Sequence, residues 1–147
     1  MQIVGSDSPS FYRAAAVIRE HLPLVAFNDG CKIIFDENRY YSVINIDNIG
    51  NVVYDHVCLD PWYMTPSHIF MVLTTVFSMG AVINAFVDPA NIRSKKFLIG
   101  VGFAKTGILR QVNGDWEIYS MTRAEWYGNR VRRHFIQKQT QNEKQTQ

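Results

Sequence analysis

The residues best suited to acid–base chemistry gather between positions 55 and 63. Asp55, His56 and Asp60 could each accept a proton from an attacking nucleophile, and the unperturbed pKa of His56 suits that task at neutral pH. Tyr63 adds a hydroxyl group that can donate or accept a hydrogen bond. Side chains of these types can take part in general acid and base catalysis. The alternative is that they are ordinary solvated or hydrogen-bonded polar residues near a strand end.

A candidate anion site follows directly in the sequence. Thr65 and Pro66 are a good capping residue and first-turn residue for a helix. The free N–H groups and the dipole of a helix N-terminus attract negative charge, and Ser67 and His68 could add side-chain donors. Plain first-turn polarity is the alternative explanation of Ser67 and His68.

A second polar group belongs to a strand–turn–helix unit over residues 81–103. The apolar run 81–87 predicts a strand, and Asp88-Pro89 ends it because proline cannot donate to a ladder. The spacing of apolar residues over 91–100 then predicts a helix that Asn91 begins. Glycines at 100 and 102 end this helix, and Phe103 starts a new strand. Asn91 could cap the helix, bind a ligand, or do both.

The residue pattern of this unit resembles that of a known family. Asn91, Ser94, Gly102 and Phe103 form the pattern N-x-x-S-x₇-G-F, which is similar to the late motif of the GNAT superfamily of acyl-coenzyme-A-dependent N-acyltransferases. Residues 107–110 and 116–121 resemble the closing hairpin of that family. The resemblance covers most of residues 1–121 and implies a mixed α/β (α+β) fold with a mostly antiparallel central sheet flanked by helices. An ordinary helix cap in another α/β domain is the alternative.

The resemblance also implies a cofactor and a site. Acetyl-coenzyme A would bind where the fourth and fifth strands diverge, and the chain would transfer an acyl group to an amine. The positions that would contact the cofactor are Leu59, Thr65, Ser67, His68, Asn91 and Ser94. The positions that would act in catalysis are His56, Asp60 and Tyr63.

Two positions depart from the family pattern. The loop before the helix at 66 contains no glycine, although family members use glycine there so that the backbone can approach the pyrophosphate. The tyrosine that many members use to protonate the leaving thiolate is Leu98 in this chain, and leucine has no proton to give.

The remaining segments predict the elements that would position these residues. Residues 2–4, 40–46 and 51–59 are predicted as strands, and residues 32–35 as a short apolar strand or an irregular edge. The Asn48–Asn51 turn joins 40–46 and 51–59 as a hairpin. Residues 10–22 have the apolar spacing of an amphipathic helix, which Pro23 stops. A further helix follows Pro66 and is expected to end near Gly80.

Composition places few limits on function. The 147 residues are 47% hydrophobic and 19% charged, as in a globular single-domain protein. Cys31 and Cys58 have no metal-site spacing, the histidines are scattered, and we expect no metal site. The uncharged stretch 69–87 approaches membrane-spanning length, but its polar residues and β-rich second half favour a buried helix and strand. We therefore expect a cytoplasmic protein, in a host cell or a virion if phage-encoded, and no membrane partner.

The C-terminal segment differs in character. Residues 122–147 hold six Lys or Arg against two Glu, in a chain whose net charge is +2. We expect a GNAT-like domain over 1–121, a basic helix over 122–137 with Trp126, Val131 and Phe135 as buried contacts, and a disordered polar tail over 138–147. The cations over 123–138 could contact nucleic acid or an acidic partner, or simply form a solvated helix face.

Two functions therefore compete. The first is a GNAT-type N-acyltransferase with acyl-coenzyme A and an unknown amine as substrates. The second is a non-catalytic protein of the same fold, acting through its surfaces on a protein partner, on a second copy of itself or on nucleic acid. The overall layout is similar to that of divergent GNAT-like proteins of tailed phages, including small virion and head-assembly proteins, which agrees with the second function.

Overall fold

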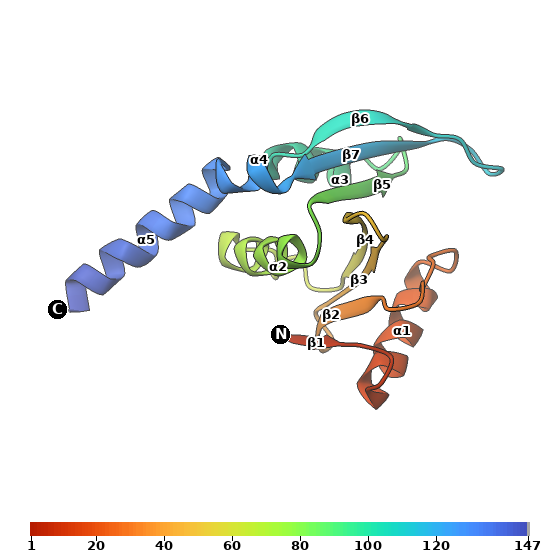
Figure 1. Cartoon of the computed structure of the whole chain (residues 1–147), viewed down its shortest axis with the longest axis horizontal. Coiled ribbons are helices and arrows are strands. Elements are labelled where there is room, and N and C mark those ends of the chain that lie inside the picture. Colours follow the sequence, from red (N-terminus) through yellow and green to blue (C-terminus); the bar gives the residue numbers. More distant parts are fainter. Residues whose placement is uncertain (147) are drawn as a thin grey trace.

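The computed structural model of the chain describes residues 1–146 and forms one seven-stranded sheet with helices on both faces (Figure 1). The elements in chain order are β1 (Gln2–Val4), α1 (Pro9–His21), β2 (Lys32–Asp36), β3 (Tyr40–Ile46), β4 (Asn51–Cys58), α2 (Pro66–Met79), β5 (Val82–Val87), α3 (Ile92–Val101), β6 (Ala104–Leu109), β7 (Trp116–Thr122), α4 (Arg123–Tyr127) and α5 (Arg130–Thr146). The strand order is β1-β2-β3-β4-β5-β7-β6. All neighbours are antiparallel except β4 and β5, so the predicted fold class is confirmed.

The sheet has two apolar faces, each with its own core. On one face α1 packs its buried side chains, among them Phe11 and Ile18, on β2 and β3. On the other face α2, α3 and α4 cover the centre of the sheet, where Val76, Ile83 and Met121 are fully buried. Strand residues alternate between these two faces because the side-chain period of a strand is two.

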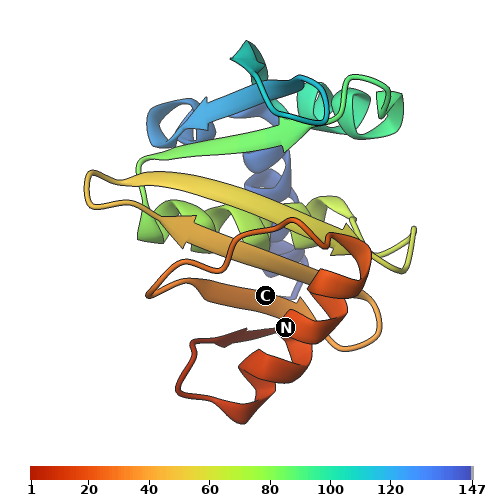
Figure 2. The same cartoon turned by 90° about the vertical axis from the view of Figure 1, so that its right-hand side faces the viewer.

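The parallel pair β4 and β5 is joined over only three residue pairs. Asn51, Val52 and Val53 pair with Val82, Ile83 and Asn84, and beyond these residues the ladder ends. Figure 2 shows the two strands diverging from this point toward their C-terminal ends. β4 pairs with β3 on its other edge, and β5 pairs with β7 on its other edge, so neither of those strands fills the gap. The divergence therefore opens the middle of the sheet.

Gly80 allows the close approach of the two strands at the start of this pair. A Cβ atom at position 80 would lie 2.3 Å from Val52 Cγ2 and 2.8 Å from the carbonyl oxygen of Gly50. The N–H of Ala81 donates to that same carbonyl oxygen at 2.8 Å. The helix therefore has to end at glycine for β5 to reach β4.

The uncharged stretch 69–87 is divided between α2 and β5, as the sequence indicates. Five residues of α2 are buried in the core, namely Ile69, Val72, Leu73, Val76 and Phe77. Within residues 1–146, no helix is both long and apolar enough to cross a membrane.

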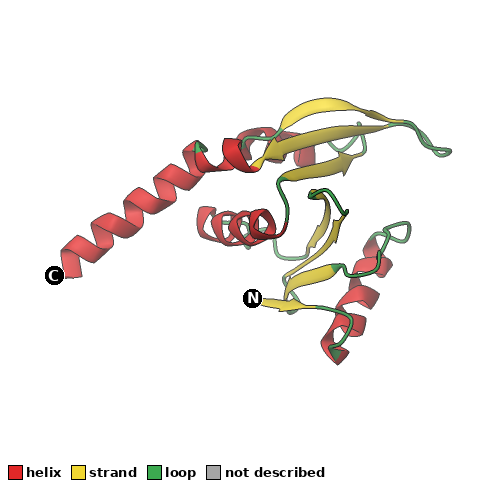
Figure 3. Ribbon diagram, in the orientation of Figure 1, coloured by secondary structure: helices red, strands yellow, loops and turns green. Residues whose placement is uncertain are grey.

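The C-terminal segment differs from the prediction in two ways (Figure 3). The single basic helix expected over residues 122–137 is two helices, because Gly128 ends α4 and the side chain of Asn129 starts α5. The tail expected to be disordered continues α5 as far as Thr146, and Gln147 lies outside the described residues. The predicted burial of Trp126 is confirmed, since only 1% of it is exposed.

Candidate active site

A cavity of about 580 Å³ opens where β4 and β5 diverge. Its lining comes from 53–56 of β4, from 85–87 of β5 with Asp88 after it, from α3 and its cap Asn91, from the segment after α1, and from the β6–β7 hairpin. Residues from both faces of the sheet line it, so the cavity passes through the gap between the strands. Its volume is within the range of ligand pockets.

The structure brings three of the predicted site residues to this cavity, namely His56, Asn91 and Ser94. His56 lies among the rings of Tyr40, Tyr54 and Phe97, with centroid distances of 5.9, 5.5 and 6.4 Å. Burial in this aromatic surrounding lowers the pKa of His56 to about 4, so the imidazole is neutral at pH 7. Neutral imidazole can accept a proton, although a base of such low pKa does so weakly.

Asn91 begins α3 at the edge of the cavity. Its Oδ1 accepts the N–H of Ser94 at 3.2 Å, which is the capping contact that its position predicts. Its Nδ2 is not part of that contact and remains as a donor at the cavity. Leu98, two turns after Asn91 along α3, also lines the cavity and is 4% exposed.

Asp55 also lines the cavity. From the sequence alone it is only one of three possible general bases. It pairs with Val43 across the β3–β4 ladder and is half-buried. Burial raises the pKa of its carboxyl group to about 6. A carboxyl group whose pKa is raised toward neutrality suits a general base.

A second group of predicted residues lies outside the lining of the cavity, with Thr65, Ser67 and His68 at the N-terminus of α2 and Leu59 directly after β4. Oγ1 of Thr65 caps the helix by accepting the N–H of His68 at 3.3 Å. The N–H of Leu59 donates to the carbonyl oxygen of Arg39 at 2.8 Å. Pro66 has no N–H, so Ser67 is the first-turn residue whose backbone donor and hydroxyl face solvent.

Tyr63 and Asp60 are held in the loop between β4 and α2. The Tyr63 side chain is fully buried between Tyr40, at a ring distance of 5.3 Å, and His68, at 4.0 Å. Burial, with the nearby Asp36 carboxylate, raises the pKa of Tyr63 to about 12. The ring nitrogen Nδ1 of His68 contacts the carbonyl oxygen of Tyr63. Neither Tyr63 nor His68 lines the cavity.

Both carboxylate oxygens of Asp60 have partners. Oδ1 accepts the N–H of Trp62 at 3.0 Å and Oδ2 accepts Nε of Arg39 at 2.9 Å. These contacts, the Trp62 N–H first, lower the pKa of Asp60. The catalytic and cofactor roles of these residues remain predictions.

Two cations flank this end of the site. Arg39 lies over the ring of Tyr63 at 4.8 Å, and both Arg39 and Arg93 of α3 are close enough to Cys58 to lower its thiol pKa, against the larger raising effect of burial. The cavity itself is different, because none of the described residues that line it is Lys or Arg. Asp60 neutralises Arg39, so Arg93 is the cation that remains at the α2 end, whereas the carboxylates Asp55 and Asp88 line the cavity.

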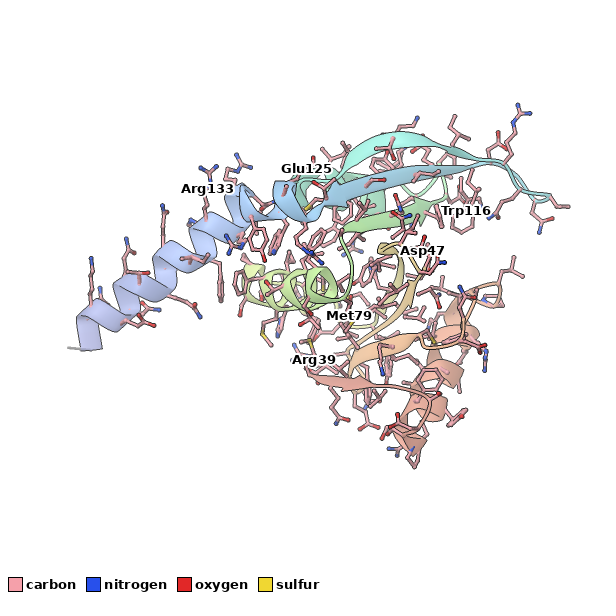
Figure 4. All side chains as sticks on the ribbon, viewed as in Figure 1. Arg39, Asp47, Met79, Trp116, Glu125 and Arg133 are labelled. Carbon is pink, nitrogen blue, oxygen red and sulfur yellow. The ribbon has the colours of Figure 1, made fainter. Side chains whose placement is uncertain are left out.

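Two walls of the cavity could not be located from the sequence. One is the segment 22–28 after α1, which Asn45 holds by accepting the N–H of Asn28 at 2.9 Å and donating to the carbonyl oxygen of Ala26 at 2.8 Å. The other is the loop end of the β6–β7 hairpin, where Leu109, Gln111 and Trp116 line the cavity. Figure 4 labels Trp116 at the start of β7. An Asn in the apolar run 40–46 was the available signal, since a buried amide needs partners.

Comparison with solved structures identifies the architecture. No family model and no curated protein sequence matches the chain. Aminoglycoside acetyltransferase AAC(6')-Ib in complex with coenzyme A and kanamycin has a TM-score of 0.52 at 13% identity, covering 66% of this chain and 68% of that one. The fold is that of the GNAT acetyltransferases.

Two further structures support the same fold. A putative acetyltransferase from T. thermophilus has a TM-score of 0.59 at 19% identity, over 84% of this chain and 74% of that one. Mycobacterium smegmatis RimJ in complex with CoA-disulfide has a TM-score of 0.54 at 20% identity, over 80% and 61%. The chain spans about two thirds of the length of the AAC(6')-Ib structures, between 64% and 68%.

Proposed function

We propose that the chain is an N-acyltransferase that transfers an acyl group from coenzyme A to an amine. The observation that carries the proposal is the cavity between the diverging strands β4 and β5, in a fold shared with acetyltransferases that were solved with coenzyme A. Arg93 and the N-terminus of α2, which lie outside the cavity lining, suit phosphates, and the carboxylates that line the cavity suit an amine.

The α2 end would hold the phosphates of coenzyme A. Ser67 offers a backbone N–H and a hydroxyl at the positive end of a helix, and Arg93 adds a full charge on the neighbouring helix. Nδ2 of Asn91 could donate to the chain that continues from these phosphates into the cavity. Acyl-coenzyme A would supply the activated thioester, whose carbonyl carbon is the reacting atom.

Acid–base work in the cavity would fall to Asp55 and His56. An amine enters as an ammonium ion, and one carboxylate or imidazole has to remove a proton before nitrogen can form the new C–N bond. As the C–S bond breaks, the thiolate leaves with its electron pair. Leu98 cannot protonate it, so the proton would come from water or from the base itself.

Calorimetric titration with acetyl-coenzyme A tests the proposal. We expect binding in the micromolar range, weakened about tenfold or more by Ser67→Asp and by Arg93→Glu, because each sets a negative charge against phosphate. Arg133→Glu, the same change on the exposed surface of α5, is the matched control and should leave the affinity unchanged. Absence of heat at millimolar acetyl-coenzyme A would contradict the proposal.

A second candidate function is a non-catalytic binding protein, which the loop without glycine and Leu98 also favour. The observation for it is α5, which leaves the body of the molecule beyond its contact with α2 (Figure 1). Arg130, Arg133 and Lys138 on this helix make no ion pair within residues 1–146. Such a helix fits the phosphate backbone of nucleic acid, as in a virion or head-assembly protein.

Anisotropy of a labelled DNA duplex tests this second function. If three phosphate contacts form, the affinity should fall about 30-fold to 50-fold between 50 and 200 mM salt. Replacing Arg130, Arg133 and Lys138 with Gln should abolish this binding, whereas Lys32, Lys96 and Arg110 replaced with Gln should not. Equal loss in both triple variants would indicate net charge rather than a surface on α5.

A further inference from the structure

The carboxylate end of the cavity has a composition of its own. Apolar residues form most of the lining, among them Leu22, Leu24, Val25, Leu109 and Trp116, and polar residues such as His21, Asn28 and Gln111 lie beside them. None of the described lining residues is Lys or Arg, whereas Asp55 and Asp88 both reach the cavity. A ligand here meets apolar surface and negative charge.

Asp55 is the carboxylate that lacks a protein partner. Tyr54 belongs to the core under α2, so Asp55, the next residue of the strand, points to the opposite, α1 face. Its oxygens make no hydrogen bond and no ion pair to any residue within 1–146. Asp88 differs, since its Oδ1 accepts the N–H of Ala90 at 2.9 Å.

A half-buried carboxylate without a partner carries a free-energy cost that a bound cation would remove. The pKa of Asp55, about 6, leaves the group mostly ionised at pH 7, so this cost is present under ordinary conditions. An ammonium group is the cation that satisfies both Asp55 and a transferase site, because its nitrogen is also the nucleophile.

The two walls determine what the rest of the ligand is. Asn45 anchors the segment 22–28 by two hydrogen bonds, so Leu24 and Val25 stand on a fixed wall. Leu109, at the end of β6, and Trp116, at the start of β7, line the same cavity. A polyhydroxylated ligand would leave its hydroxyl groups against these apolar side chains without hydrogen-bond partners.

We propose that the acceptor is a primary monoamine with an aromatic or aliphatic body, its ammonium group on Asp55 and its body between Leu24 and Trp116. This rests on the proposed acyltransferase function. The inference adds the class of acceptor to the proposed transfer reaction. It also predicts that the site does not favour an amine with several charges and many hydroxyl groups.

The test is calorimetric titration of the full chain with 2-phenylethylamine, ethanolamine and kanamycin, with and without saturating acetyl-coenzyme A. We expect 2-phenylethylamine to bind about tenfold or more tightly than either other amine. Asp55→Asn should weaken its binding about tenfold or more, because a charge-assisted hydrogen bond is lost. Asp29→Asn, the same change at an exposed carboxylate outside the cavity, should not weaken it.

Trp116→Ala is the second variant, and it should reduce the preference for 2-phenylethylamine over ethanolamine. Circular dichroism and thermal unfolding show whether each variant is folded. Tighter binding of kanamycin, or an Asp55→Asn variant of unchanged affinity, would overturn the inference. If acetyl-coenzyme A binds and no amine does, the acceptor class is wrong, whereas amine binding without acetyl-coenzyme A binding would refute the transferase function alone.

Discussion

Asp55 and His56 are adjacent on β4, and burial shifts the pKa of both side chains. The two shifts have opposite effects on how the stability of the fold changes with pH. The pKa of Asp55 is raised to about 6, so the folded state binds its proton more tightly than the unfolded state and stability falls as pH rises to about 6. The pKa of His56 is lowered to about 4, so the unfolded state binds its proton more tightly and stability falls as pH drops from about 6.5 to 4. Between pH 4 and 6 the two slopes offset each other.

Asp55→Asn removes one of these slopes. We expect the variant to be more stable than the parent at pH 7 by about 2 kcal/mol, since each unit of pKa shift is worth about 1.4 kcal/mol and partial exposure reduces the full value. It should also lose stability on acidification from pH 7 to 4, which the parent resists. Urea unfolding at a series of pH values measures both effects, and a parallel pH profile for the two proteins would contradict this account.

Gly80 shows how one missing side chain fixes the junction of β4 and β5. Gly80→Ala would place a methyl group against Val52 Cγ2 and the Gly50 carbonyl oxygen, neither of which can move freely. We expect a loss of about 2 kcal/mol in the free energy of unfolding. Gly100→Ala is the control, because nothing lies within 4 Å of its Cβ position and alanine favours the helix α3 by up to about 1 kcal/mol. Thermal unfolding of both variants makes the comparison.

At the scale of elements, Asn129 joins α4, α5 and α3. Its Oδ1 accepts the N–H groups of Val131 at 2.8 Å and Arg132 at 3.2 Å, and its Nδ2 donates to the carbonyl oxygen of Val101 at 2.6 Å. Asn129→Ala should destabilise the protein by about 1 to 2 kcal/mol, because a helix cap and a tertiary hydrogen bond are lost together. Amide exchange in α5 should accelerate more than in α2. Gln141→Ala, on the exposed part of α5, should change neither.

The sequence was sufficient to predict most elements and their order. Apolar alternation in 40–46 and 51–59, the turn between them, and Pro23 and Pro66 as helix punctuation placed β3, β4, α1 and α2 within two residues of their ends. The break at Gly128-Asn129 was missed, because the charge pattern of 123–137 is that of one helix and glycine in a helix is tolerated. The helix over 138–146 was missed because composition alone describes its polar residues as a tail.

The candidate site was less predictable than the fold. His56, Asn91 and Ser94 meet at the cavity because β4 and the start of α3 both border the gap between β4 and β5. The segment 22–28 and Trp116 lie far from those positions in sequence and reach the cavity only through tertiary contacts, such as those of Asn45. Periodicity within a segment carries no information about such contacts.

At the scale of the whole molecule, α5 is attached to the body by its first turns alone. The ring of Phe135 stacks on Phe70 of α2 at 4.3 Å, and residues 137–145 are exposed. A chain that ends at Gln137 should therefore keep its melting temperature within about 2 °C, because few buried contacts are removed. Phe135→Ala should lower it more, since it removes an aromatic pair worth about 1 kcal/mol. A large fall on truncation would show that 138–146 packs on the body.

The three-pair ladder between β4 and β5 also has a consequence for how the chain folds. It divides the sheet into β1–β4, built largely from successive hairpins, and β5–β7, whose β6–β7 hairpin is local. Local contacts form before distant ones, because closing a long loop costs entropy before it brings any contact. We therefore expect the docking of the two halves through α2 to be the late, rate-limiting event, with the cavity absent until it is complete.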